Sequence, residues 1–259
     1  MFKLFTAVAA VILFSVGAVF AGGSYSEEHS FSAVLEAGSN LIINNINGDI
    51  TIEEWDSDNL LIDYIIKSDD LEEIQSIDVI FERIDGILCE VTYPYSWECG
   101  TDAEVNFYVK LPQALNLNLA MQTVNGSISL KNGVGTSLIE IINGSAVLEG
   151  FSGDLTVNVI SGEIELIDVP GLSMANIVNG TIRGTIDNVD RDVEILTVSG
   201  LIDLVIESAA SVSVTTISGE IDIPGVEIIE NLVGSSAEYG HGLYTIDITT
   251  VSADIIIRR

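Results

Sequence analysis

A repeated pattern of apolar and polar positions organises residues 122–257. In each repeat an apolar residue, an Asn or Ser and a glycine precede alternating apolar positions, as in Val124-Asn125-Gly126-Ser127-Ile128. The phrase returns with glycines at 144, 162, 180, 200 and 219, so the steps from 126 are 18, 18, 18, 20 and 19 residues. A fixed period near twenty is typical of stacked repeats and not of a globular core with one pocket.

The positions around each glycine predict strands with one buried face. Residues two and four after the glycine are almost all aliphatic, such as Ile164 and Leu166, and the residue two before it is always Val or Ile. Alternation and β-branching both favour a half-buried strand. We therefore expect these columns to face the interior. The Asn-Gly or Ser-Gly pair should form a corner between coils, because glycine adopts positive φ without steric cost.

The predicted fold class is all-β: a parallel β-helix or solenoid with coils of about 18–20 residues, right-handed by the crossover rule, plus an N-terminal antiparallel β insertion. Each coil should hold two short strands, such as Ser127 to Leu130 and Ser137 to Ile142, joined by the turn Lys131 to Thr136. Equivalent side chains of neighbouring coils should stack in ladders about 4.8 Å apart.

One outward column should carry a charge ladder. Three residues after the glycine stand Glu165, Arg183 and Asp203 in successive repeats. Arg183 should therefore lie between two acids and lower their repulsion. This is a surface role and not a ligand-binding one.

Three segments are predicted along the chain: a signal peptide at 1–21, an N-terminal β region at 22–121 and the solenoid repeats at 122–259. Lys3 precedes the apolar stretch Val11 to Phe20, and Val19-Phe20-Ala21 provides a small-residue cleavage site. The mature chain is expected to be extracytoplasmic, either periplasmic, on the cell surface or secreted, with no membrane insertion after the signal is removed.

The N-terminal β region contains one early coil and several other strands. Ile46-Asn47-Gly48-Asp49-Ile50-Thr51-Ile52 matches the repeat phrase, and Asp85-Gly86 is a hairpin signal. The best helix candidate is Ser68 to Gln75. Further strands are expected at Leu60 to Ile66, Ile77 to Ile84, Ile87 to Thr92, Val105 to Leu111 and Leu115 to Met121.

The last repeat departs from the pattern. In Val251-Ser252-Ala253-Asp254-Ile255, alanine replaces the glycine. Terminal repeats are often atypical because they cap an open sheet edge. We therefore expect residues 244–257 to finish the array.

Charge narrows the possible partners. The chain has 39 Asp+Glu against 9 Lys+Arg, and removal of Lys3 with the signal leaves 8 − 39 = −31. Such a charge argues against nucleic acid and anionic membranes as partners. Asp56-Ser57-Asp58-Asn59 and Asp69-Asp70-Leu71-Glu72-Glu73 could offer oxygen ligands to calcium, although a solvated acidic face is the simpler interpretation.

Cys89 and Cys99 are the two cysteines of the chain. In an exported protein such a pair predicts a disulfide, here across a short loop. A redox or metal pair is the alternative, but the spacing is not C-x-x-C. The loop holds Tyr93, Tyr95 and Trp97, which could cover one end of the core or form a tip that binds a sugar or a protein.

The chain resembles the bacterial putative adhesin family of unassigned function. The Asn-Gly and Ser-Gly phrases carry the resemblance, together with Val109-Lys110-Leu111-Pro112 and the ending Gly240-His241-Gly242-Leu243-Tyr244-Thr245-Ile246. It spans roughly residues 30–257, and Ala253 departs from the family's usual glycine. The resemblance implies a β-solenoid fold and an extracytoplasmic place.

These observations predict a non-enzymatic adhesin or interaction module, without cofactors, that binds a surface glycan or protein. A calcium-assisted envelope protein is one alternative, and a polysaccharide-acting β-helix enzyme is another. His29 and His241 have no catalytic partner that the sequence reveals. We expect a monomer, because the negative charge opposes stacking of the solenoid ends.

Overall fold

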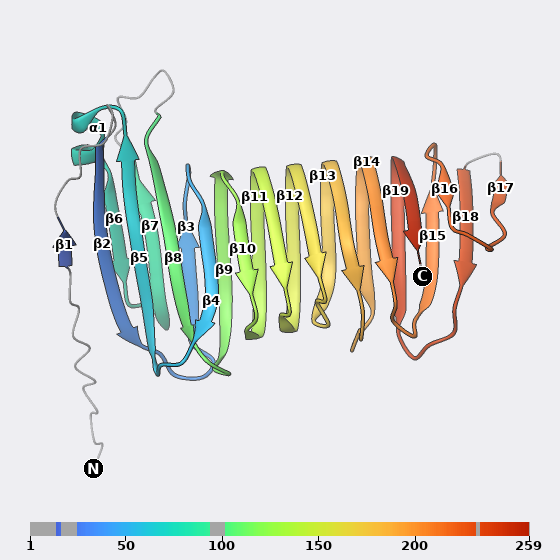
Figure 1. Ribbon diagram of the computed structural model, residues 1–259, viewed down its shortest axis with the longest axis horizontal. Helices are drawn as coiled ribbons and strands as arrows, with labels where there is room; N and C mark the ends of the chain where they lie inside the picture. Colours follow the sequence, from blue (N-terminus) through green and yellow to red (C-terminus); the bar gives the residue numbers. More distant parts are fainter. Residues whose placement is uncertain (1–13, 17–24, 94–101, 232–233, 259) are drawn as a thin grey trace, which may run out of the picture.

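The computed structural model describes residues 14–16, 25–93, 102–231 and 234–258. Over these residues the chain is all-β, with nineteen strands in one continuous, mostly parallel sheet and a single short helix. No helix in the described part of the chain is long and apolar enough to cross a membrane. Figure 1 shows the strands side by side along the long axis of the molecule.

The middle of the molecule is a regular parallel array. It contains β11 (Val134–Glu149), β12 (Ser152–Ile167), β13 (Leu172–Ile186) and β14 (Val193–Ile206). From β11 to β12 the offset is 18 residues throughout, with Ala146 opposite Ile164 and Gly144 opposite Gly162. The predicted period of 18 residues is therefore the sequence offset between paired residues of neighbouring strands.

Each long strand turns at its glycine without losing its backbone pairing. In β11 the buried positions are odd-numbered through Ile141 and even-numbered from Ala146, so the alternation changes phase at Asn143-Gly144. Gly162 has a φ of 148°, and a Cβ added there would lie 1.7 Å from the carbonyl oxygen of Gly144. The two strands predicted on either side of each corner are thus two parts of one bent strand.

At the corners, one column of residues that was predicted to face inward faces outward instead. The residues two and four after the glycine are buried, including Ile164 and Leu166 at 0% exposure. The residue two before it points outward, and it is the residue three before it, such as Ile141, that is buried. The alternation changes phase at the corner, so only one of the two adjacent residues can face inward. The buried one is apolar at Ile141, Val159 and Ile177 and polar at the other corners, as at Thr197.

The outward column forms a continuous apolar row, which we call the corner ridge. It runs through eight neighbouring turns of the chain, and six of its members are 38–55% exposed. In spatial order its residues are Ile46, Val124, Ile142, Ile160, Val178, Val198, Val251 and Ile217.

The C-terminal end is permuted relative to the sequence. The final strand β19 (Thr245–Arg258) does not finish the array: it lies between β14 on one side and β15 (Ser211–Thr216) and β16 (Ile221–Asp222) on the other. The end is instead formed by β18 (Gly234–Tyr239), antiparallel to β15, and by β17 (Ile229–Asn231), antiparallel to β18. Ala253 takes the glycine position opposite Gly200 and is fully buried.

The N-terminal end has a related arrangement. The early coil is present as β3 (Asn40–Asn44) and β4 (Ile50–Trp55), which pair in parallel with β9 (Asn116–Asn125) and β10 (Ile128–Lys131). On their other sides lie β7 (Gly86–Thr92) and β8 (Glu104–Pro112). The turn predicted from Lys131 to Thr136 is only two residues long in the structure, because β10 ends at Lys131 and β11 begins at Val134.

Antiparallel strands close this end, as the sequence predicted. β2 (Tyr25–Val34) pairs with β5 (Asn59–Ser68), which pairs with β8. The Asp85-Gly86 hairpin is confirmed between β6 (Asp78–Glu82) and β7. The predicted helix is the six-residue α1 (Leu71–Ser76), and the carboxylate of Asp70 caps it by accepting from Glu72 N at 2.8 Å.

Two predictions concern residues at or beyond the limits of the described chain. Strand β1 (Phe14–Val16) lies within the predicted signal peptide and pairs antiparallel with β2. Cys89 is fully buried in β7, and this burial raises the pKa of its thiol. Cys99, Tyr95 and Trp97 lie outside the described residues, so the Cys89–Cys99 disulfide and the aromatic tip stay predictions.

Candidate functional site

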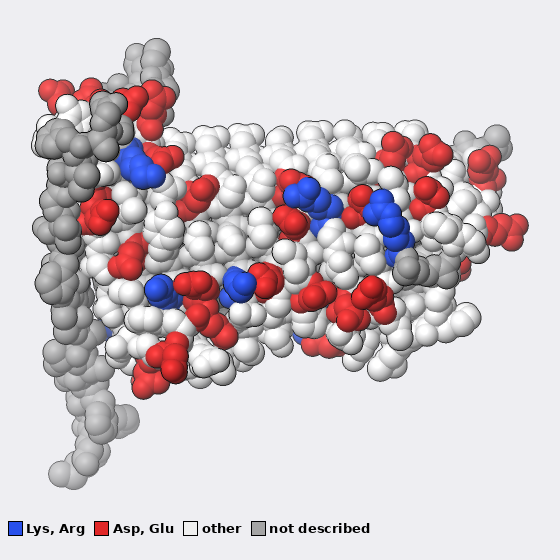
Figure 2. All heavy atoms as spheres, viewed as in Figure 1, with Lys and Arg blue, Asp and Glu red and all other residues white. Residues whose placement is uncertain are grey.

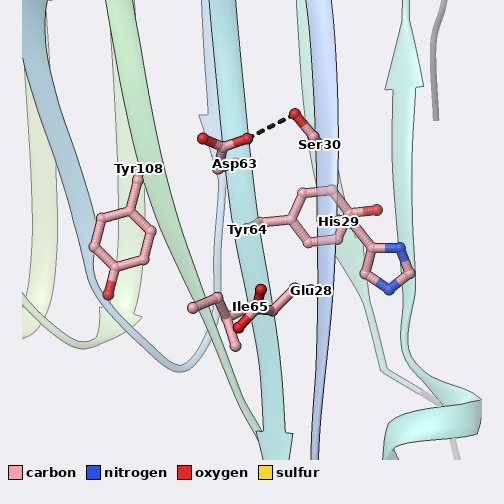
Figure 3. A pocket seen from close by; sticks show the side chains of 7 residues that line it. All are labelled: Glu28, His29, Ser30, Asp63, Tyr64, Ile65 and Tyr108. Atoms are coloured by element: carbon pink, nitrogen blue, oxygen red, sulfur yellow. Dashed lines mark hydrogen bonds between the residues drawn. The ribbon is translucent and has the colours of Figure 1, made fainter. Parts of the chain in front are cut away.

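A hollow of about 340 Å³ lies against β2, β5 and β8. Three outward side chains stand in one row across these strands, because Ser30 is opposite Asp63 and Asp63 is opposite Tyr108. Glu28 and Ile65 lie one row away on the same two strands and also line the hollow. Figure 3 shows these side chains and the bond between Ser30 and Asp63.

Alternation along the strands explains why these residues are outside. In β8, Val105, Phe107, Val109 and Leu111 are buried, which leaves Tyr108 outward and 44% exposed. In β5, Ile62, Tyr64 and Ile66 are buried in the same way, so Asp63 and Ile65 face outward. The same pleat that fills the core therefore places an aromatic ring beside a carboxylate on the surface.

The polar contacts of the hollow are simple. Ser30 Oγ donates to Asp63 Oδ1 at 2.6 Å, which orients one carboxylate oxygen and leaves Oδ2 available as an acceptor. Glu28 adds a second, exposed carboxylate at the edge of the hollow. An exposed ring beside hydrogen-bond acceptors can pack against the apolar face of a ligand and accept from its hydroxyl groups.

Ser30, His29 and Asp63 do not form a nucleophilic triad. Ser30 bonds directly to Asp63, whereas His29 points to the opposite side of β2. There His29 stacks on Tyr64 with ring centroids 4.9 Å apart, and its Nε2 lies 3.5 Å from Glu27 Oε2. Activation of Ser30 would need a base at hydrogen-bond distance, and His29 does not occupy that position.

Beneath the hollow the strands are anchored by an aromatic cluster. Phe31 stacks on Phe81 at 4.2 Å, and Tyr64 contacts both Phe81 and Phe107. Burial raises the pKa of Tyr64 to about 12, with smaller contributions from the charges of Cys89 and Glu27. Tyr64 is therefore neutral at physiological pH and supports the floor of the site without contributing charge.

A second aromatic contact lies on the same outward face. Lys110 Nζ sits 5.7 Å from the centroid of the Trp55 ring. Lys110 is two residues after Tyr108 in β8 and is opposite Glu53 in β4. The face around the hollow thus combines two aromatic rings, several carboxylates and the cations Lys110 and Lys67, the latter paired with Glu104 at 3.4 Å. Figure 2 shows Lys and Arg side chains scattered among Asp and Glu along one side of the molecule.

The predicted charge ladder is present with one change. Arg183 lies between Glu165 and Asp203 in the parallel register. Its side chain contacts Glu165 Oε2 at 3.4 Å and, more closely, Glu163 Oε1 at 2.6 Å. Asp203 pairs instead with Arg258. The cause is the insertion of β19, which brings a cation that the sequence order does not place beside Asp203.

Parts of the two acidic stretches that could offer calcium ligands have structural roles. Asp70 caps helix α1, and residues 56–58 form the tight connection between β4 and β5, where Trp55 Nε1 donates to the Asn59 carbonyl at 2.8 Å. Within the described ranges, no three His, Cys, Asp or Glu side chains converge on a point that could hold a metal ion.

The hollow was not predicted from the sequence. The predicted candidate surface was the aromatic loop at 93–97, and Val105 to Leu111 was predicted only to be a strand. The signal was available in that strand: Tyr108 and Lys110 occupy the outward positions between apolar residues. What the sequence could not show is that β2 and β5 bring Ser30 and Asp63 beside that ring.

Comparisons with known proteins find only distant likenesses. No protein family model and no curated protein matches the chain. Among solved structures, it is similar to a putative cell adhesion protein from Clostridium sporogenes, with 12% identity, a TM-score of 0.36, and coverage of 89% of this chain and 99% of that one. It is also similar to a putative adhesin from Parabacteroides distasonis, with 11% identity, a TM-score of 0.26, and coverage of 88% and 97%. Both likenesses are too remote to assign a function.

Proposed function

We propose that the protein is an exported, non-enzymatic β-solenoid of the adhesin type, which binds a hydroxyl-rich surface ligand at the hollow on β2, β5 and β8. The observation that carries the proposal is the half-exposed ring of Tyr108 beside the Ser30–Asp63 pair. Core packing does not require an aromatic residue at this outward position. A glycan or a glycosylated protein supplies both an apolar ring face and hydroxyl donors.

The parallel array provides the rigid support that a surface-binding module needs. Every strand of the hollow is joined through β4 and β10 to the long array of β11–β14. We infer that the array is a right-handed solenoid of 18–20-residue coils, as the sequence predicted. The lysine and apolar stretch within residues 1–21 support export.

Export would also change the edge of the site. β1 pairs with β2 from Glu28 to Ser30 and belongs to the predicted signal peptide. Its removal would leave the backbone of β2 unpaired beside the hollow. A ligand of the mature chain could therefore meet free backbone donors and acceptors as well as the side chains, so the binding test requires residues 22–259.

The experiment exposes residues 22–259 to envelope glycans, matrix glycoproteins and whole cells, and measures both retained ligand and cleaved product. We expect binding without turnover, weakened at least about tenfold by Tyr108→Ala or Asp63→Asn. Asp222→Asn is the matched control, because Asp222 is an exposed acid in the outward row that begins with Ser30 and Asp63, at the far end of the molecule. An affinity that is unchanged in Tyr108→Ala, or turnover of a polysaccharide, would contradict the proposal.

A further inference from the structure

The corner ridge is apolar although the chain around it is strongly acidic. Its eight residues are all Val or Ile, and they run without interruption from Ile46 to Ile217. Neighbouring strands are about 4.8 Å apart, so seven steps make a row about 34 Å long. Exposed apolar residues are normal when scattered, but a continuous row of this length indicates a contact surface.

The positions that flank the ridge are almost free of charge. They are the residue two before each ridge residue and the residue directly after it, which makes sixteen positions in eight turns. Fifteen are uncharged, mostly Asn, Ser, Thr or Gln, and one is Glu140. Since 39 of 259 residues in the chain are acidic, this strip is depleted of carboxylates.

The space-filling view agrees with this count. In Figure 2 the upper rim of the array, over β11, β12 and β13, is white. The acids visible on this face lie below the rim or towards the two ends of the molecule. The strip is therefore a neutral band on an acidic protein.

A shallow groove runs beside the ridge. It has a volume of about 380 Å³, and its walls include Val124, Ile142 and Ile160 on the ridge and Gln122, Glu140 and Asn158 on the flanking row. A methyl-bearing side chain from a facing surface could enter this groove. The flanking amides already hydrogen-bond to their own kind, since Asn143 Nδ2 donates to Asn125 Oδ1 at 3.0 Å and Asn125 Nδ2 donates to Asn47 Oδ1 at 2.8 Å.

We propose that the corner ridge is a self-association surface, on which two copies of this chain pack ridge against groove about a two-fold axis. The same patch would serve on both copies, as an isologous interface requires. An antiparallel copy presents Ile and Val side chains with the same spacing as the groove. It also presents amides that can both donate and accept.

Charge favours a second copy at this strip over other faces. The formal net charge of −30 makes two copies repel when their acidic faces approach. Along the strip only Glu140 adds a carboxylate in the flanking positions of each copy. The ridge with its two flanking rows is about 34 Å long and about 10 Å wide, roughly 340 Å² per partner, which is the size of a weak, transient contact and not of a standard interface of ~800 Å² per partner.

The monomer expected from the sequence was argued only against end-to-end stacking of two solenoids. The C-terminal end is closed by antiparallel β17 and β18, and the N-terminal end by β2, β5 and β6. The ridge runs along the side of the array, so association through it does not compete with these caps. The inference is also independent of the hollow and of the ligand proposed for it.

Sedimentation equilibrium of residues 22–259, between about 1 and 300 µM, tests the proposal in the micromolar range. We expect a reversible dimer that moderate salt strengthens, because salt screens the repulsion between acidic copies. The double variant Ile142→Thr, Ile160→Thr keeps β-branching and strand propensity but removes ridge methyl groups. It should weaken the dimer at least about tenfold.

The matched control is Val147→Thr, Ile167→Thr, which makes the same type of change on the same two strands. Both control residues face the opposite outward side of the array. The control should change the dimer dissociation constant less than about twofold. Circular dichroism of both variants checks that they fold. Ile160→Glu, at a position 47% exposed, is a second route if the double variant expresses poorly, and it should abolish the dimer.

Three results would overturn the proposal. One is a monomer at all concentrations and salt conditions. Another is a dimer whose dissociation constant is unchanged in the ridge variants. The third is a monomeric protein whose ridge variants lose binding to a glycan or to another protein, which would assign the ridge to a different occupant.

Discussion

The middle of the molecule and its two ends follow different rules of assembly. Between β11 and β14, strands that are consecutive in the chain are neighbours in space. At the C-terminal end β19 lies between β14 and β15, and at the N-terminal end β3 and β4 lie between strands that follow them. A repeat phrase therefore specifies which columns align, but it does not specify which repeats become neighbours.

The physical reason is that all repeats offer equivalent partners. Where two repeats pair, the corner glycine lies opposite another small residue and most aliphatic residues lie opposite aliphatic residues. The phrase of residues 251–255, with Ala253 opposite Gly200, therefore fits there as the Gly219 phrase would. The antiparallel strands at the ends cannot be extended by another parallel coil. Their hairpins take the outermost places, and the remaining repeat fills the place inside them.

The largest expected effect tests which side of a strand is buried. Ile164 and Ile160 both belong to β12, but Ile164 is fully buried and Ile160 is 47% exposed. Ile164→Asp should cost about 4 kcal/mol or more of unfolding free energy, because it buries a charge. Ile160→Asp should cost less than about 1 kcal/mol. Urea denaturation at low protein concentration measures both, and equal losses would show that the inward column is wrong.

The next effect tests the permuted C-terminal end. Ile255 in β19 lies opposite Ile202 in β14, and both are fully buried. Ile255→Ala and Ile202→Ala should each cost about 2–5 kcal/mol, as for other large-to-small core changes. A β19 that merely capped the array would lose under about 1 kcal/mol on this substitution. Thermal and urea unfolding of the two variants decide between these arrangements.

A smaller effect tests the glycine corners. An alanine at Gly162 would need a positive φ and would place its Cβ against the carbonyl of Gly144, whereas Gly38 has a positive φ with nothing within 4 Å. Gly162→Ala should cost about 2 kcal/mol or more, and Gly38→Ala about 1 kcal/mol. Calorimetry of both variants is the measurement. A Gly162→Ala protein as stable as Gly38→Ala would mean that the turns do not approach each other closely.

The smallest expected effect is a difference in stability between variants of two buried threonines that lie opposite each other on β14 and β19. Thr197 Oγ1 is buried without a hydrogen-bond partner, whereas Thr250 Oγ1 bonds to Thr216 Oγ1 at 2.8 Å. Thr197→Val should raise the stability by about 1 kcal/mol, because it removes an unpaired polar group. Thr250→Val should lower it by about 1 kcal/mol, because it leaves Thr216 with one bond fewer. Melting temperatures that move in the same direction would refute the contrast.

The sequence predicted much of the fold and little of the candidate site. The period, the glycine corners, the buried Ile164 column, the Asp85-Gly86 hairpin and the position of Arg183 all come from local pattern. The hollow required contacts between residues far apart in the chain, since Ser30, Asp63 and Tyr108 stand on three strands. No local pattern shows which outward residues of separate strands will share one row.

Taken alone, the chain determined the all-β class, the eighteen-residue spacing and the alternation within each straight strand, because these follow from side-chain volume and glycine geometry inside one repeat. Only the tertiary structure decided that the Val or Ile before each corner turns outward, in several turns while an adjacent Thr or Asn is buried, and so created the ridge. It also decided the order of the turns at both ends. Both depend on how strands pack against neighbours, and equivalent repeats carry no local signal that distinguishes one neighbour from another.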